Sequence, residues 1–125
     1  MQRKPLVAIV DDNESIRETT KDLLESAGLD VATFASAEDF LGSAPLPDLS
    51  CAVADMRMSG MNGLALHEHL LAAGTPVPII LMTAYPDERA RARALETGVV
   101  AYLTKPFTDA ELLGCIGAAV RERSR

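Results

Sequence analysis

The sequence predicts an α/β fold in which five parallel strands form one sheet covered by helices on both faces. Four short apolar runs, at residues 6–10, 51–54, 79–82 and 101–104, are separated by helix-length stretches. Such runs are typical of strands buried on both faces of a parallel sheet. Each run is followed by a polar residue, and regular alternation of strands with helices gives a three-layer, doubly wound sandwich with right-handed crossovers.

The length and composition favour a single domain. With 125 residues and 48% hydrophobic content, the chain can close one core, so we expect residues 1–125 to form one domain without an effector domain. No apolar run approaches the roughly 18 residues of a membrane span, and the formal charge of −6 argues against nucleic-acid binding by this segment. Cys51 and Cys115 lack metal-type spacing, which favours reduced core thiols and a cytoplasmic location.

The first half of the chain supplies three strands and two helices. After the strand at 6–10, Asn13 or Asp12 can cap a helix that runs to about residue 27 and ends at Gly28. A short strand at 30–34 precedes a brief helix that begins at Ser36 or Ala37, and prolines mark the loop before the strand at 51–54. The inward positions of the first helix should be Ile16, Thr20, Leu23, Leu24 and Ala27.

The second half adds three more helices. Residues 56–62 form a loop before a helix at 63–73. The next helix, at 87–97, offers only Ala90, Ala94 and Leu95 for burial, which predicts weak anchoring. Thr108 and Glu111 have the spacing of a capping box, which opens a last helix that continues to residue 123.

Polar side chains follow four of the strands and predict a site. Asp11 and Asp12, Asp55, Thr83 and Lys105 come directly after them, and ligands bind beyond the carboxyl ends of parallel strands. Two carboxylates about 4 Å apart repel by about 4 kcal/mol at an effective dielectric constant of about 20. Three carboxylates together therefore need a proton or a cation, and Mg²⁺ or Mn²⁺ suits oxygen ligands.

These motifs resemble the receiver domains of two-component response regulators, the family of the chemotaxis regulator. The resemblance covers residues 7–120, and the wording around Asp55 is closest to receivers of nitrogen-fixation-type regulators. It implies the flavodoxin-like strand order 2-1-3-4-5. The matching motifs are Val10-Asp11-Asp12, Asp55-x-x-Met58-x-Gly60, Thr83-Ala84 and Lys105-Pro106-Phe107.

The resemblance also implies roles for the site residues. Asp55 corresponds to the phosphoacceptor and to a metal ligand. Asp12 and the backbone carbonyl of Arg57 would bind the same metal ion directly, and Asp11 would bind it mainly through water. Lys105 would neutralise the phosphoryl oxygens as charge spreads over them, and Thr83 would donate its hydroxyl to the same oxygens.

Further positions correspond to parts of the family's switch. Thr83 would move toward the phosphoryl group and Tyr102 would turn inward, altering the surface of the fourth helix, fifth strand and fifth helix. Tyr85, like Arg57, flanks the entrance in the family and influences hydrolysis of the acyl phosphate. Pro106 corresponds to the family's cis peptide after the lysine.

Two local features depend on the residues of this chain. Many relatives have proline at the position of Ser59, so the loop after Asp55 should be less rigid here. The guanidinium of Arg57 is also placed to pair with Asp11 or Asp55 when no metal is bound.

The expected function is a phosphorylation-dependent signalling switch rather than an enzyme. A sensor histidine kinase or a phosphotransfer protein would supply the phosphoryl group, and the output would act on a partner or an effector domain, with transcription as the expected readout. The last helix offers a wide apolar face, which favours a homodimer that forms on phosphorylation through the surface of the fourth helix, fifth strand and fifth helix.

Two other functions stay open from the sequence. One is a phosphorylation-independent binding module on the same fold. The other is a phosphatase with an aspartyl nucleophile, although Asp11-Asp12-Asn13 lacks an acidic residue two positions after its first aspartate and the chain is short for a substrate cap.

Overall fold

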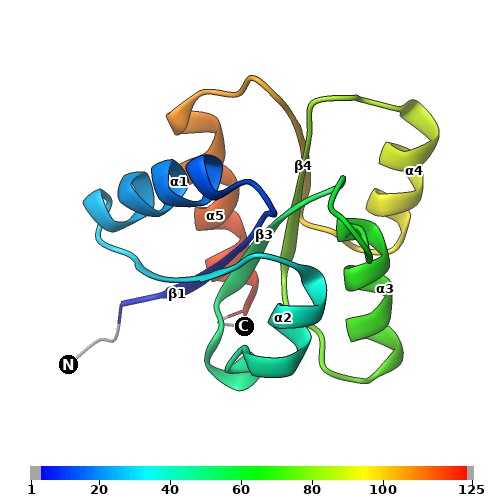
Figure 1. Cartoon of the computed structure of the whole chain (residues 1–125), viewed down its shortest axis with the longest axis horizontal. Helices are drawn as coiled ribbons and strands as arrows, with labels where there is room; N and C mark the ends of the chain where they lie inside the picture. Colours follow the sequence, from blue (N-terminus) through cyan, green and yellow to red (C-terminus); the bar gives the residue numbers. More distant parts are fainter. Residues whose placement is uncertain (1–3, 124–125) are drawn as a thin grey trace.

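Five parallel strands form the centre of the molecule in the order β2-β1-β3-β4-β5 (Figure 1). The computed structural model describes residues 4–123, and within them the predicted fold class and strand order are confirmed. The strands are β1 (Leu6–Val10), β2 (Asp30–Phe34), β3 (Cys51–Asp55), β4 (Ile79–Thr83) and β5 (Ala101–Thr104).

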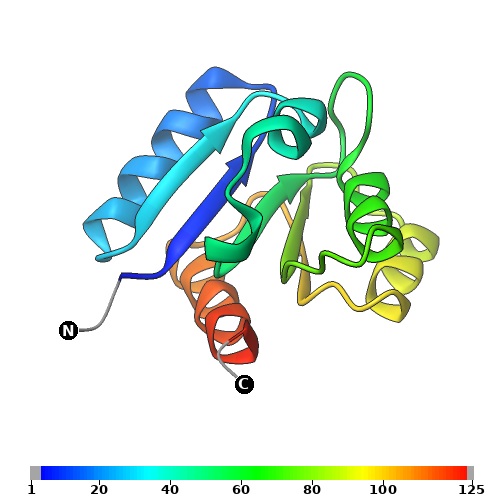
Figure 2. The same ribbon diagram turned by 90° about the horizontal axis from the view of Figure 1, so that it is seen from below.

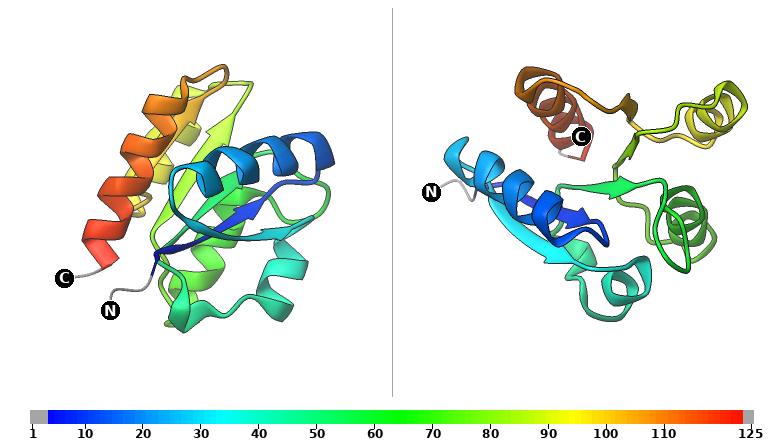
Figure 3. Two further views of the ribbon diagram at one scale, coloured as in Figure 1. Left: turned by 90° about the vertical axis from the view of Figure 1, so that its left-hand side faces the viewer. Right: turned by 45° about the horizontal axis from the view of Figure 1, so that its top comes forward.

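Helices cover both faces of this sheet and give it three layers (Figures 2 and 3). One core lies between the sheet and α1 and α5, and the other lies between the sheet and α2, α3 and α4. Among the described residues, every helix is too short or too polar to cross a lipid bilayer. The helices are α1 (Glu14–Ser26), α2 (Ala37–Ser43), α3 (Gly63–Ala72), α4 (Glu88–Glu96) and α5 (Asp109–Arg123).

Alternating residues of each central strand enter opposite cores, which explains the continuous apolar runs. On β1, Val7 and Ile9 pack in the core under α1 and α5, whereas Ala8 and Val10 pack in the other core. Cys51 follows the same rule on β3: it is a free thiol, fully buried on the α1 and α5 side. Burial raises the pKa of Cys51 to about 12, so this residue is an inert part of the core.

The helix caps follow the predicted signals. Asn13 caps α1, with its Oδ1 accepting the N–H of Ile16 over 3.1 Å. At α5 the N–H of Thr108 donates to Glu111 Oε1 over 2.9 Å, and the N–H of Glu111 donates to Thr108 Oγ1 over 3.0 Å. Both ends of the expected capping box are therefore made.

Two predicted core positions are wrong. Ala27 is exposed because α1 ends at Ser26 and Ala27 is its C-cap residue. Leu95 is 40% exposed, since α4 turns one narrow stripe to the sheet and Ala94 is its buried residue. The fourth helix is thus anchored by even less apolar surface than the sequence indicates.

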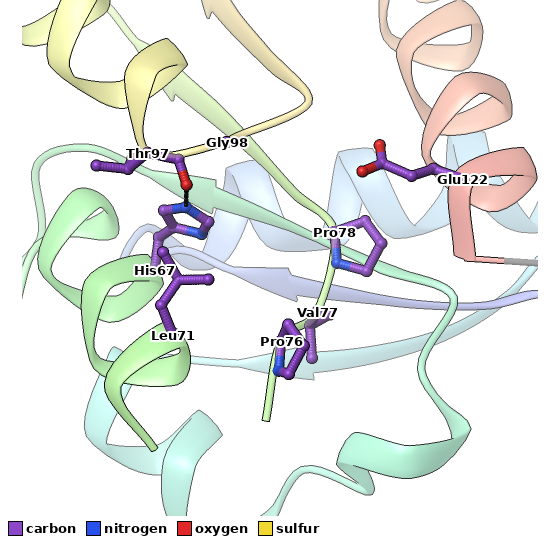
Figure 4. A pocket seen from close by; sticks show the side chains of 8 residues that line it. All are labelled: His67, Leu71, Pro76, Val77, Pro78, Thr97, Gly98 and Glu122. Atoms are coloured by element: carbon purple, nitrogen blue, oxygen red, sulfur yellow. Dashed lines mark hydrogen bonds between the residues drawn. The ribbon is translucent and has the colours of Figure 1, made fainter. Parts of the chain in front are cut away.

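Polar contacts from α3 hold the C-terminal end of α4. His67 points from α3 toward that end, where its Nε2–H donates to the carbonyl oxygen of Thr97 over 2.9 Å (Figure 4). Arg93 and Glu68 form an ion pair of 2.7 Å nearby. The hollow beside His67, about 400 Å³, is lined by the segment that precedes β4, so it lies at the amino edge of the sheet.

Candidate functional site

Strand register brings the predicted polar residues to one edge of the sheet. Val10 pairs with Ala54, so Asp11 and Asp55 follow at the same level. Thr83 pairs with Thr104 on the neighbouring strands, so Lys105 lies one residue beyond Thr83. The Lys105 Nζ atom lies 2.9 Å from Asp55 Oδ2 and 3.9 Å from Asp11 Oδ2. The structure thus joins two predicted carboxylates through one ammonium group.

Among the carboxylates of the site, Asp11 has the least favourable electrostatic environment. Its side chain is fully buried, its Oδ1 accepts the N–H of Asn13 over 2.9 Å, and its Oδ2 has no hydrogen-bond partner in residues 4–123. Burial raises the pKa of Asp11 above its ordinary value, and repulsion from Asp55 and Asp12 adds to the rise. The N–H of Asn13 and the charge of Lys105 act in the opposite direction on this pKa.

The other two carboxylates are held by backbone N–H groups of the loop after β3. Asp55 Oδ1 accepts the N–H of Arg57 over 2.9 Å, and Asp12 Oδ2 accepts the N–H of Ser59 over 3.1 Å. Asp55 is buried at the end of its strand, whereas Asp12 is exposed. The α3 helix starts directly against this strand end: a Cβ on Gly63 would lie 2.6 Å from the carbonyl oxygen of Asp55, so only glycine allows this approach.

The donor set matches a hard divalent cation in type and charge. Asp11, Asp12 and Asp55 supply carboxylate oxygens against one ammonium, and Asp11 Oδ2 is a buried acceptor that receives no hydrogen bond and lies 3.9 Å from that ammonium. In the present arrangement no three acidic, histidine or cysteine side chains of the described chain are close enough to enclose an ion. Hydrogen bonds to the loop and to Lys105 hold these carboxylates instead.

The β3–α3 and β4–α4 loops meet above the site through a cation–π contact. The Arg57 guanidinium carbon lies 4.3 Å from the centre of the Tyr85 ring. The hypothesis that this guanidinium pairs with Asp11 or Asp55 is wrong in this structure, since the described ion pairs do not include it and it stacks on the ring. The N–H of Tyr85 donates to Thr83 Oγ1 over 3.0 Å, which fixes this buried hydroxyl.

Tyr102 and Pro106 lie on the β5 side of the site. The half-buried Tyr102 packs against the core under α4 and borders a hollow of about 440 Å³. Pro86, Asp87 and Glu88, at the start of α4, line the same hollow. The Lys105–Pro106 peptide bond is cis.

Sequence reasoning missed two groups around the site. The Arg17 guanidinium donates to the carbonyl oxygen of Asp11 over 2.7 Å, and Glu38 Oε2 accepts the N–H of Met61 over 3.1 Å. In each of these contacts one partner is a backbone group, which nearly every residue type has, so the sequence does not indicate where the partner lies.

Comparisons with known proteins agree with the arrangement. Residues 7–116 match the family model described as the response regulator receiver domain. The transcriptional regulatory protein FixJ of Bradyrhizobium diazoefficiens is 35% identical over 98% of this chain and 60% of its own length. Nodulation protein W of the same organism is 40% identical over 98% of this chain and 54% of its own length. The chain thus spans little more than half of these curated relatives.

Solved structures show the same fold. Response regulator StyR superposes with a TM-score of 0.91 at 39% identity, covering 98% of this chain and 62% of StyR. The structure named FixJ-N superposes with a TM-score of 0.85 at 33% identity, covering 97% of this chain and 96% of that one.

Asp11→Asn should stabilise the metal-free protein at neutral pH by about 1 kcal/mol, the scale of an unsatisfied buried polar group. Because the folded-state pKa of Asp11 is raised, its ionisation destabilises the fold as the pH rises through that value. The gain should therefore shrink below the ordinary aspartate pKa. Thermal unfolding in a chelator, at neutral and acidic pH, measures it. A lower melting temperature for the variant at neutral pH contradicts this assignment.

Proposed function

We propose, because the chain belongs to the response regulator receiver domain family, that it is a phosphorylation-dependent switch that receives a phosphoryl group on Asp55. The donor is a sensor histidine kinase or a phosphotransfer protein. One observation carries the proposal: Asp55 ends a buried strand with the Lys105 ammonium 2.9 Å from its Oδ2, and the same ammonium lies 3.9 Å from the buried Asp11 Oδ2, which has no hydrogen-bond partner.

The proposed transfer uses groups already placed at the sheet edge. A carboxylate oxygen of Asp55 forms the new bond to phosphorus while the phosphorus–nitrogen bond of the donor phosphohistidine breaks. The bonding electron pair stays on the imidazole nitrogen, which then takes a proton. Lys105, whose ammonium donates to Asp55 Oδ2, would neutralise the charge that spreads over the phosphoryl oxygens. Thr83 accepts the N–H of Tyr85, so its own hydroxyl proton stays available for a phosphoryl oxygen.

The metal site in this proposal is built from Asp11, Asp12, Asp55 and the backbone carbonyl of Arg57. Bound Mg²⁺, or Mn²⁺, would offset carboxylate charge and polarise the phosphoryl group. The support is the chemistry of the donors: three carboxylates lie at the same edge of the sheet, and Asp11 Oδ2 is buried without a hydrogen-bond partner.

The switch in this proposal acts at the N-terminal end of α4. A phosphoryl group adds about two negative charges and three acceptor oxygens, which draw the Thr83 hydroxyl away from its present position. His67 and Glu68 hold the C-terminal end of α4, so rearrangement is easiest where Tyr85 and the Tyr102 hollow lie. The altered surface is then that of α4, β5 and α5.

The role of the whole protein is also part of the proposal. Relatives named as transcriptional regulators support control of transcription in the cytoplasm, with residues 1–125 as the receiver unit that regulates a partner or output domain. This unit assists its own phosphorylation and dephosphorylation without acting on a separate substrate. It does not bind nucleic acid itself, in keeping with its charge of −6.

Asp55→Asn should abolish phosphorylation by a small acyl phosphate with Mg²⁺. The unmodified protein should gain about 80 Da, the mass of one phosphoryl group, and intact mass spectrometry measures it. Asp30→Asn, which changes an exposed aspartate at the start of β2, is the matched control and should label fully. Labelling of Asp55→Asn would refute the assignment, and no labelling of any variant would favour a phosphorylation-independent binding module.

Asp12→Ala and Lys105→Ala should separate metal binding from transfer. Loss of Asp12 removes a ligand and negative charge, so Mg²⁺ affinity and phosphorylation should both fall by about tenfold or more. Loss of Lys105 removes a positive charge, so Mg²⁺ binding should persist while phosphorylation slows. Calorimetric Mg²⁺ titration alongside labelling rates tests this. Equal loss of metal binding in both variants means that the roles are misassigned.

Phosphorylation should promote self-association through α4, β5 and α5. Leu95 is exposed there, and Leu113 and Val120 are half-buried beside the core residues of α5. Sedimentation with and without beryllofluoride and Mg²⁺ should show a resting monomer or weak dimer that becomes a tighter dimer. A mass unchanged at tens of micromolar (a working range for weak dimers) points to a different partner for this face.

A further inference from the structure

Two acidic side chains hold the loop between β3 and α3, and neither comes from the loop itself. Asp12, which follows β1, accepts the N–H of Ser59 over 3.1 Å. Glu38, on α2, accepts the N–H of Met61 over 3.1 Å. These partners are 47 and 23 residues away in sequence, so the loop joins the metal-site edge to α2.

Gly60 lies between the two contacts and makes them compatible. Its φ of +80° lies in the left-handed region that favours glycine, and a Cβ at this position would lie 2.7 Å from Glu38 Oε2. Glu38 therefore packs directly against the loop backbone. The Ser59 and Met61 N–H groups on either side of Gly60 donate to two different carboxylates.

We propose that the backbone N–H of Ser59 is a positioning group for Asp12, which sets the Mg²⁺ affinity of the site and links metal occupancy to the β3–α3 loop. The inference rests on the proposed function, since it assigns Asp12 to the metal. Asp12 is exposed, so an unrestrained carboxylate would lose side-chain freedom on binding a cation. The Ser59 N–H fixes one oxygen in advance and leaves the other as a ligand, in the manner of an outer-shell hydrogen bond.

Whether the hydrogen bond to Asp12 can form depends on the residue type at position 59, because its donor is the backbone N–H. Proline has no N–H, so a receiver with proline here lacks the hydrogen bond that Ser59 makes to Asp12. The Ser59 hydroxyl is not the donor, so alanine preserves the contact. Position 59 therefore tunes the metal site without supplying a ligand.

Binding at Asp12 and order in the loop must influence each other equally, because coupling free energies are reciprocal. Mg²⁺ that immobilises Asp12 also immobilises its partner Ser59. Met61, two residues further on, is held by Glu38, so the added order extends to α2. This link gives metal occupancy a second readout that is independent of phosphoryl transfer.

The decisive comparison is Ser59→Pro against Ser59→Ala, measured by calorimetric titration with Mg²⁺ alone. Ser59→Ala should bind within about twofold of the unmodified protein, and Ser59→Pro should bind about tenfold more weakly, at the low end of the effect of outer-shell partners. Unchanged or tighter binding by Ser59→Pro overturns the inference, as does equal weakening in Ser59→Ala. If the unmodified protein itself binds no Mg²⁺, the proposed metal site fails together with the inference.

A measurement on the unmodified protein does not depend on how well the variants fold. Amide hydrogen exchange should show the Ser59 and Met61 amides protected without metal, and more strongly protected when Mg²⁺ is added. A Ser59 amide that exchanges as fast as an unbonded loop amide, with and without Mg²⁺, overturns the inference. Normal phosphorylation of Asp55 in the same sample would then leave the proposed function standing.

Discussion

The buried carboxylate of Asp11 beside Asp55 is the constraint on which the rest of the site depends. The carboxyl ends of parallel strands lie at one edge of the sheet, where β3 ends at Asp55 and Asp11 directly follows β1. Burial and repulsion raise the pKa of Asp11, and one ammonium group serves both carboxylates, at 2.9 Å from Asp55 and 3.9 Å from Asp11. The fold accepts this electrostatic cost at the edge that we propose as the phosphorylation site, and perturbed pKa values of this kind cluster at functional sites.

The loops above that edge connect the charged residues of the site to one another and to neighbouring strands. Arg57 and Tyr85 join the β3–α3 loop to the β4–α4 loop by stacking, and Tyr85 holds the Thr83 hydroxyl. Asp12 joins the β3–α3 loop to β1 through Ser59. A metal ion or phosphoryl group that binds Asp12 or Thr83 would therefore also affect the hydrogen bonds that these residues make to Ser59 and Tyr85 in the neighbouring loops. The thin anchoring of α4, with Ala94 as its buried residue, makes that helix a natural place for the change to appear.

Much of this arrangement was predictable because its signals are local. The apolar runs indicated the strands, the polar residues after them indicated the sheet edge, and the Thr108–Glu111 spacing indicated the α5 cap. The strand order came from the family resemblance. Contacts between a side chain and a distant backbone N–H, such as Glu38 with Met61, carry no pattern in sequence. The exposure of Leu95 was missed because periodicity does not fix how wide a stripe α4 turns to the sheet.

The melting temperature as a function of Mg²⁺ concentration tests the central claim most directly, since it reports whether a cation relieves the carboxylate cluster. A ligand that binds only the folded state stabilises it in proportion to the logarithm of its concentration once the site is filled. The account predicts a continuous rise in melting temperature with Mg²⁺ for the unmodified protein, and a rise that begins only at about tenfold or higher Mg²⁺ concentration when Asp12 is replaced by alanine. A melting temperature unchanged from chelator to excess Mg²⁺ in the unmodified protein would contradict the account.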